Sequence, residues 1–392
     1  MWNVIFLGLV SFFADISSEM VYPIIPLYLT SVFGATPALV GLIEGIAESL
    51  ASLLKVFSGY LTDRYQKKKP IAFIGYSTGL LYKVALVLAG SWVGILGARV
   101  IDRVGKGIRT APRDVMVSES AKAGQAGHAF GVHKALDMAG SALGILIAYL
   151  LLRNTNGNFD YRRVFLFSII PALLSLVMFV KIREKKAAGP RKEREPFWTN
   201  MRKLDGQLKL YLVVTFLFTL GNSSNAFLLL RAKRVGFDDT SVILLYFIYN
   251  LTASLLAIPA GRRSDKVGRK RLLVSGYLVF ALVYFGFAFA FSRNFMVMLF
   301  VLYGVYTAMI AGVERAFIAE ISPLELKGTM LGLHSTVVGI ALLPASTIAG
   351  VLWTAFGAEV PFIFGACMSL VAAGMLLLLM KGGRHETGNV AG

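Results

Sequence analysis

The sequence predicts an all-α integral membrane protein, a bundle of twelve transmembrane helices arranged as two pseudo-symmetric six-helix halves. The chain of 392 residues is 56% hydrophobic and only 16% charged. Most of it falls into apolar runs of about 20 residues, the length that crosses a bilayer core. The runs form two sets of six, and a similar basic stretch follows the second run of each set, which indicates a duplicated unit.

The duplicated stretch covers Gly59–Lys69 in the first set and Gly261–Arg271 in the second. Each copy begins with Gly, holds one Asp and ends in basic residues, so we expect a short basic turn between helices. A shift of 202 residues superposes these copies. Further along, a shift of 201 residues pairs Glu119 with Glu320, Gly127 with Gly328, Gly131 with Gly332 and His133 with His334. Agreement at one register favours tandem halves related by a two-fold axis along the membrane normal.

The elements follow in order from a first apolar run that we expect to be retained as a helix. It has no basic leader or small-residue cleavage site, unlike a signal peptide. The expected helices cover residues 4–31, 37–60, 70–89, 92–111, 127–151, 164–182, 208–230, 240–260, 271–291, 294–314, 327–353 and 358–380. The predicted organisation is one half over 1–182, a cytoplasmic linker over 183–206, the second half over 207–380 and a cytoplasmic tail over 381–392.

The formal charge of +18 is unevenly distributed along the chain. Basic residues cluster in alternate loops, as the positive-inside bias of membrane proteins predicts, which argues against a nucleic-acid partner. We therefore expect a multi-pass protein of the cell inner membrane, in contact with the lipid bilayer and with both termini cytoplasmic. The single cysteine, Cys367, lies in an apolar run and excludes an internal disulfide.

Gly59–Lys69 and Gly261–Arg271 resemble the loop signature of the major facilitator superfamily. The stretch Arg103–Ala111 resembles that family's fourth-helix signature, with Lys106 where the signature usually has Gln. The region from Asp102 to Asp114 is similar to a prokaryotic subgroup near the drug:proton antiporters. The resemblance implies alternating access to a small-molecule substrate by a protein that acts mostly as a monomer.

The resemblance also implies a cytoplasmic gate. In the family the loop Asp contacts the start of a helix in the opposite half, where free N–H groups stabilise a carboxylate. Glycines at the contact let the backbones approach closely. Residues carried over to this gate are Gly59, Asp63, Arg64, Gly131, Gly261, Asp265, Arg269 and Gly332.

Ionisable side chains at membrane depth are functional candidates, because they are costly to keep there. Counting the helical rise places Asp15, Glu48, Arg103 and Asp137 at similar depth, with Asp102 beside Arg103. Crowded carboxylates in a low dielectric cannot all be ionised, so the cluster suits proton coupling. We expect Glu48 or Asp15 to carry the proton, with Arg103 as counter-charge. The alternative is a static network of charges that pins the helices together.

Other polar and aromatic residues are candidates for the substrate cavity. Glu19 and Glu44 lie nearer the outer end, where solvent exposure would explain them equally well. Lys83 is expected to extend its ammonium group to a membrane surface. In the second half, a polar run interrupts the seventh helix and tyrosines line the eighth and tenth. The candidates there are Asn222, Asn225, Tyr249 and Tyr303.

Two alternatives to proton-driven export of small amphipathic organic compounds stay open. His133 and Asp137, four residues apart, could be two ligands of a metal ion, which would suit transport of a metal or a metal chelate such as a siderophore. The other alternative is a membrane receptor that transports nothing. The sequence has no motif of a hydrolytic or phosphate-binding enzyme, so we expect neither an enzyme nor a cofactor.

Overall fold

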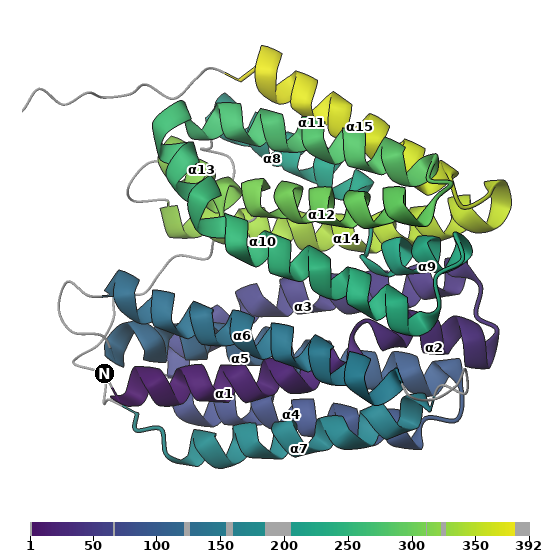
Figure 1. Ribbon diagram of the computed structural model, residues 1–392. Coiled ribbons are helices and arrows are strands. Elements are labelled where there is room, and N and C mark those ends of the chain that lie inside the picture. The colour runs from purple at the N-terminus through teal and green to yellow at the C-terminus, as the bar shows by residue number, and fades with distance from the viewer. Residues whose placement is uncertain are drawn as a thin grey trace, which may run out of the picture.

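The computed structural model describes residues 2–65, 67–120, 126–153, 160–184, 205–310, 312–322 and 327–380. Fifteen helices lie within these ranges, grouped as two bundles side by side (Figure 1). The first bundle holds α1 (Trp2–Val21), α2 (Ile24–Phe33), α3 (Pro37–Tyr65), α4 (Lys68–Leu88), α5 (Trp92–Ser120), α6 (Ala126–Leu152) and α7 (Tyr161–Val180).

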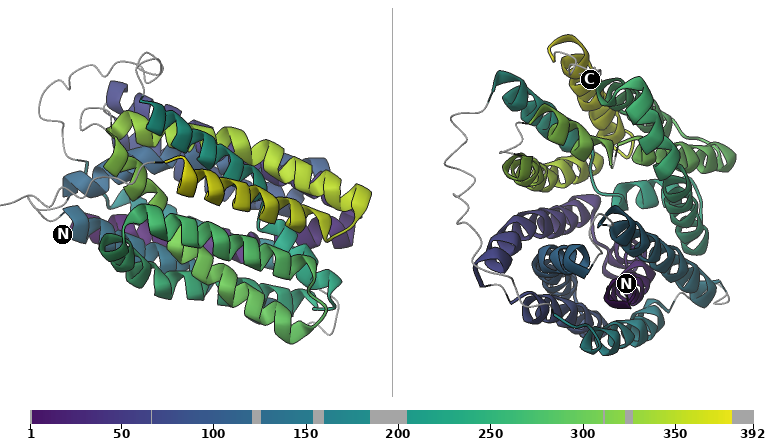
Figure 2. Two further views of the ribbon diagram at one scale, coloured as in Figure 1. Left: turned by 90° about the horizontal axis from the view of Figure 1, so that it is seen from above. Right: turned by 90° about the vertical axis from the view of Figure 1, so that its left-hand side faces the viewer.

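The second bundle repeats this plan. It holds α8 (Gly206–Gly221), α9 (Ala226–Arg234), α10 (Asp239–Val267), α11 (Arg269–Ala288), α12 (Arg293–Ile310), α13 (Val313–Ile321), α14 (Lys327–Phe356) and α15 (Val360–Leu378). Seen along the helices, the two bundles occupy opposite sides of the molecule (Figure 2, right). The predicted fold class, twelve spans in two halves, is confirmed, because three of the spans are each built from two helices in line. The exact bounds predicted for the halves, linker and tail stay a prediction.

The helix bounds of the two halves agree at the shifts that the sequence repeat predicts. α3 and α10 both have 29 residues and begin 202 residues apart. α5, from Trp92 to Ser120, corresponds in the repeat to α12 and α13 together, which extend from Arg293 to Ile321. Both ends are 201 residues apart. The duplication is therefore structural as well as sequential.

Breaks in the first span of each half also correspond. α1 ends at Val21 and α2 begins at Ile24, because Pro23 has no N–H group to continue the helix. The first helix was expected to be continuous, and that expectation was wrong. α8 ends at Gly221 and α9 begins at Ala226, so the Asn-Ser run between them interrupts the seventh span as predicted.

Two further expectations need correction. The signature stretches were expected to form turns, but α3 continues to Tyr65 and α10 to Val267, so most of each signature is helical. The turn after α10 is made by Gly268 alone, whose φ of 89° is unfavourable for residues with a Cβ. The tenth span was expected to end near residue 314, but its second helix, α13, continues to Ile321.

α5 differs from the other spans in hydropathy. Eleven spans of the described chain are long and apolar enough to cross a membrane, and α5 is not among them. It carries a charged residue at almost every turn yet packs between α3 and α4, so most of its charges face protein instead of lipid. The charged interior of the first half is therefore concentrated on this helix.

The two halves meet along α3 and α14, which pack closely over much of their length. A Cβ on Gly41 would lie 2.2 Å from the backbone oxygen of Ser346, and one on Gly350 would lie 2.5 Å from that of Pro37. Only glycine permits this approach. A second contact runs between α6 and α10. In Figure 1 these two helices converge toward the end of the molecule that holds α2 and α9.

Candidate functional site

A cavity of about 180 Å³ lies in the first half on the side that faces the second. The end of the bundle where α3 and α10 end is called the basic end here, and the end that holds α2 and α9 the opposite end. The cavity lies between them and combines three carboxylates with three cationic groups. Its lining residues are Ser18, Glu19, Tyr22, Glu48, Tyr82, Arg99, Asp102, Arg103 and Lys106.

The innermost wall of the cavity contains an ion pair between α3 and α5. Arg99 Nη2 donates to both carboxylate oxygens of Glu44, each at 2.6 Å, and the two side chains are 1% and 2% exposed. Burial of two charges is tolerated because each satisfies the other at short range. Glu44 is therefore buried between α3 and α5, which excludes the solvent exposure that the sequence left open for it. Its place among the substrate-cavity candidates stays a prediction.

One helical turn further along, the same two helices form a second pair. Arg103 Nη2 lies 2.7 Å from Glu48 Oε1, and its Nε lies 3.8 Å from Asp102 Oδ2. α3 and α5 run parallel, so acids spaced four apart on one meet arginines spaced four apart on the other. The predicted association of Glu48, Asp102 and Arg103 is thus present in the structure, while their role in proton coupling stays a prediction.

Two carboxylates of the first half, Glu19 and Glu44, form hydrogen bonds with the second half. Tyr246 on α10 donates from its hydroxyl group to Glu19 Oε2 at 3.3 Å. Ser224, in the break between α8 and α9, donates to Glu44 Oε2 at 3.3 Å. The charged side chains of the first half therefore contact the second half at Tyr246 and at Ser224, and Ser224 lies in the break of the seventh span.

Asp15 and Asp137 form a separate acidic site closer to the basic end. Asp15 on α1 and Asp137 on α6 lie close enough for their carboxyl groups to interact. Two carboxyl groups can form a hydrogen bond with each other only when one of them is protonated. Lys134 Nζ approaches Asp137 Oδ2 at 2.8 Å. The structure brings these two candidates together, but apart from the Glu48–Arg103 pair with which the sequence grouped them.

The histidine considered as a metal ligand has a different partner. His133 is buried, and its Nε2 lies 2.9 Å from the hydroxyl group of Ser11 on α1. Over the described part of the chain, no group of three His, Cys, Asp or Glu side chains could hold a metal ion. The geometry gives no support to a site formed by His133 and Asp137.

The corresponding region of the second half is aromatic. Tyr303 donates to Asn225 Oδ1 at 2.9 Å, and Asn222 Nδ2 donates to the hydroxyl group of Tyr306 at 2.9 Å. The rings of Tyr249 and Tyr303 have centroids 5.0 Å apart. The amides at the α8–α9 break are thus satisfied by tyrosine hydroxyl groups, and the predicted cavity candidates of this half form one cluster.

Three cationic residues of the site were missed or misplaced by sequence reasoning. Arg99 was not singled out, although it stands four residues before Arg103 and matches the spacing of Glu44 and Glu48. Lys83 was expected at a membrane surface, but it is 1% exposed, and its Nζ lies 4.1 Å from the ring centroid of Tyr82. Lys106 was noted only as an unusual residue in a motif. Their inclusion makes the cavity a mixed-charge site instead of an acidic one.

The predicted gate at the basic end falls largely outside what the structure describes. This holds for the side chains of Asp63, Arg64 and Asp265, and for Gly59 and Gly131. At Gly261 and Gly332 a Cβ would meet no described atom within 4 Å. The side chains of residues 59–65, which were expected to approach Gly332, lie outside what the structure describes. Arg269 Nη1 lies 2.9 Å from Glu320 Oε2. The gate stays a prediction.

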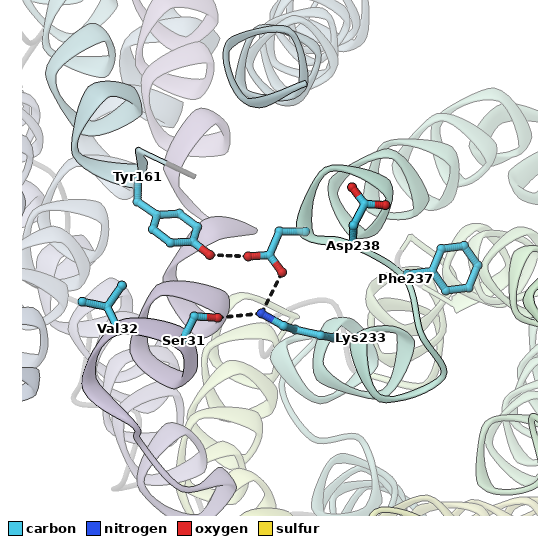
Figure 3. A pocket seen from close by; sticks show the side chains of 7 residues that line it. Ser31, Val32, Tyr161, Lys233, Phe237 and Asp238 are labelled. Atoms are coloured by element: carbon cyan, nitrogen blue, oxygen red, sulfur yellow. Dashed lines mark hydrogen bonds and ion pairs between the residues drawn. The ribbon is translucent and has the colours of Figure 1, made fainter. Parts of the chain in front are cut away.

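The opposite end has a described polar contact between the halves, called the Asp239 lock here (Figure 3). Asp239 at the start of α10 accepts a hydrogen bond from the hydroxyl group of Tyr161 on α7 and lies 2.8 Å from Lys233 Nζ on α9. Lys233 also donates to Ser31 Oγ on α2 at 2.6 Å. The lock borders a surface pocket of about 360 Å³ and holds the halves together at this end.

A duplicated twelve-span bundle with a polar cavity facing the plane between its halves defines the class of the protein, which is that of a membrane transporter. The sequence pattern of the Major Facilitator Superfamily matches residues 7–229 and 210–392. The chain belongs to this superfamily.

Relatives and solved structures agree with the assignment. An uncharacterized MFS-type transporter of Methanocaldococcus jannaschii is 36% identical over 384 residues, covering 96% of this chain and 94% of the relative. The fosmidomycin resistance protein of Escherichia coli is 24% identical over 387 residues, covering 95% and 91%. The crystal structure of the nucleoside transporter NupG superposes with a TM-score of 0.80 at 12% identity over 97% of this chain and 100% of that one. A D-xylose–proton symporter gives 0.77 at 17% identity over 97% and 98%, and both structures bear on the fold alone.

Proposed function

We propose that this protein is a proton-coupled transporter that exports small amphipathic organic compounds from the cytoplasm by alternating access. The observation that carries the proposal is the position of Glu19, which lines the cavity and also forms a hydrogen bond with the second half. Its carboxylate lines the cavity and accepts a hydrogen bond from Tyr246 across the plane between the halves. Protonation of such a group changes a contact that has to break when the halves separate, which links proton binding to conformation.

The neighbouring pairs supply what coupling requires. Glu48 lines the cavity and is held by Arg103, a permanent counter-charge that can remain in place when the acid is neutralised. The Asp15–Asp137 pair is a second candidate protonation site toward the basic end, the end that the positive-inside bias predicts to face the cytoplasm. Protons could therefore be exchanged at two levels of the first half.

Export is the direction favoured by the relatives. The Escherichia coli relative is named for resistance to fosmidomycin, and a membrane transporter confers resistance when it removes the compound from the cell. A tyrosine-rich second half suits the apolar part of an amphipathic molecule, because tyrosine rings bury apolar area and offer a hydroxyl group.

The test uses sealed everted vesicles with an imposed proton gradient and a pH-sensitive dye inside. Amphipathic compounds are added to vesicles that contain the native protein, Glu19→Gln or Glu48→Gln. We expect the gradient to collapse with the native protein and to persist with both variants, because an amide cannot take up a proton. Asp205→Asn is the matched control, since this exposed carboxylate caps α8 and an amide serves equally well.

Two results would count against proton coupling. If both glutamine variants dissipate the gradient like the native protein, the carboxylates only pin the helices. If substrate accumulates in vesicles without any change of the internal pH, the protein transports by another coupling ion or by facilitated diffusion.

A further inference from the structure

We infer that the cavity binds the anionic head group of an amphipathic substrate, with Lys106 and Arg103 as its cationic contacts. This inference rests on the proposed transport function and adds the sign of the substrate's charge to it. It follows from which charged groups of the cavity are already paired within the protein.

The carboxylates of the cavity have partners. Glu48 is paired with Arg103 at 2.7 Å, and Asp102 lies 3.8 Å from the same guanidinium group. Glu19 accepts a hydrogen bond from the hydroxyl group of Tyr246. A cationic substrate would have to displace one of these contacts before it gained one of its own, which lowers the net benefit of binding.

The cationic groups of the cavity have fewer partners within the protein than the carboxylates have. Lys106 is exposed at the cavity wall, and its ammonium group makes no hydrogen bond or ion pair with any described residue. Among the described residues, Arg103 Nε and Arg99 Nε are buried without a hydrogen bond, and so is Lys83 Nζ behind Tyr82. These buried nitrogens lie behind the cavity wall, where a ligand does not touch them but where their positive charge favours an anion in the cavity.

The free hydrogen-bond donors of the cationic groups favour a ligand that has a negatively charged oxygen. Guanidinium groups bind carboxylate, sulfonate and phosphonate oxygens through several directed hydrogen bonds, and an ammonium group adds a point charge. Arg103 is buried in the cavity wall, where a contact with its guanidinium group is stronger than one in water. A permanently charged oxyanion at this position would face Lys106 and Arg103 from one side.

The apolar part of the ligand has a neighbouring surface. The cavity volume of about 180 Å³ is below the roughly 300–1,000 Å³ of pockets that hold whole drug-sized ligands, so it accommodates a head group. Tyr22, in the cavity wall, lies next to Tyr246 with ring centroids 5.7 Å apart. Tyr249 and Tyr303 continue this row of rings, at 5.6 Å and 5.0 Å spacing. The rings of the second half are buried in this conformation, so the apolar part of an amphipathic molecule would reach them when the halves separate.

The experiment compares three compounds that share a phenylbutyl skeleton and differ in the head group. They are 4-phenylbutane-1-sulfonate, 4-phenylbutyl-trimethylammonium and 4-phenylbutan-1-ol, of which the first two are permanently charged and do not titrate in the assay. Binding is measured as the concentration-dependent rise in melting temperature of the purified protein, and transport as proton flux in proteoliposomes. We expect the sulfonate to bind best and the trimethylammonium compound to bind least.

Variants at one position identify the contact. Lys106→Gln is expected to weaken sulfonate binding at least tenfold, and Lys106→Arg to retain most of it, because the positive charge is conserved. Lys209→Gln is the matched control, since Lys209 is exposed on α8 outside the cavity. Binding of the neutral alcohol should change less than twofold in all three variants.

Each remaining outcome has a defined meaning. If the trimethylammonium compound binds or drives proton flux better than the sulfonate, the inferred charge is wrong while proton-coupled transport stands. If the sulfonate binds through Lys106 without proton flux, the anion site stands and coupling fails. If Lys106→Gln binds the sulfonate like the native protein, or if none of the compounds shifts the melting temperature, the inference is overturned.

Discussion

The two halves share a helix plan but place different chemistry at equivalent positions. A shift of 202 residues puts Tyr246 where the first half has Glu44, and a shift of 201 puts Tyr303 where it has Asp102. The same backbone positions therefore hold ion pairs in the first half and tyrosine rings in the second. The two halves thus share the order of the spans and the break in the first span of each, while their interior side chains differ. One half now supplies charges and the other supplies aromatic surface.

The difference matters because the two interiors respond differently to substitution. A buried ion pair depends on both partners, since removal of one leaves the other charged in a low dielectric. A cluster of rings loses mainly contact area and single hydrogen bonds when one member changes. The first half should therefore be the more sensitive of the two, and the following predictions test this in order of expected effect.

The largest effect is expected at the Glu44–Arg99 pair. Glu44→Gln leaves the Arg99 charge buried and uncompensated, which costs about 3–5 kcal/mol. Arg99→Met in the same background removes the second charge and should restore a large part of the loss. Melting temperatures of the native, single and double variants in detergent measure the effect. A double variant as unstable as the single one would show that the charge is not what destabilises the protein.

A smaller effect is expected at the Asp239 lock, where both halves contribute. Asp239→Asn keeps a hydrogen-bond acceptor for Tyr161 but removes the charge that holds Lys233. The halves should then separate more often at this end, which a membrane-impermeant maleimide detects as faster labelling of Thr240→Cys, a buried position beside Asp239. Cys367→Ser removes the exposed native thiol from all samples. We expect a several-fold higher rate, and an unchanged rate would mean that the lock does not limit opening.

The smallest effect is expected in the aromatic half. Tyr303→Phe keeps the ring and removes the hydroxyl group that donates to Asn225. Loss of one such hydrogen bond costs about 1 kcal/mol, a shift of a few degrees or less in melting temperature. A loss as large as that of Glu44→Gln would contradict the contrast between the halves.

The sequence predicted the architecture well, because the number and order of the spans follow from apolar length and from the repeat, and both can be read from the sequence. Apolar length gave the number of spans, and the repeat register gave the correspondence of α3 with α10 and of α5 with α12 and α13. The break at Asn222 was visible as a polar run in an apolar segment. The break before Pro23 was missed, although a proline without an N–H group was available as a signal.

The candidate site was predicted less completely, for a geometric reason. Counting residues along a helix gives depth in the membrane but not which face a side chain takes or which helix lies opposite. For Glu44 the sequence therefore left both the substrate cavity and solvent open, while the structure buries it against Arg99. The acids were identified as a group, but the state of each one depends on partners from other helices. Lys106 became informative only when the structure gave its neighbours.

The low hydropathy of α5 has a consequence for how the protein enters the membrane. A charged residue at the centre of a transmembrane helix costs about 2.5–3.5 kcal/mol during insertion, and α5 holds Arg99, Asp102, Arg103 and Lys106 within two turns. Such a segment does not partition into lipid by itself. We expect it to enter together with α3, whose Glu44 and Glu48 pair with its arginines in the folded protein, so that insertion of α5 depends on a segment made earlier in synthesis.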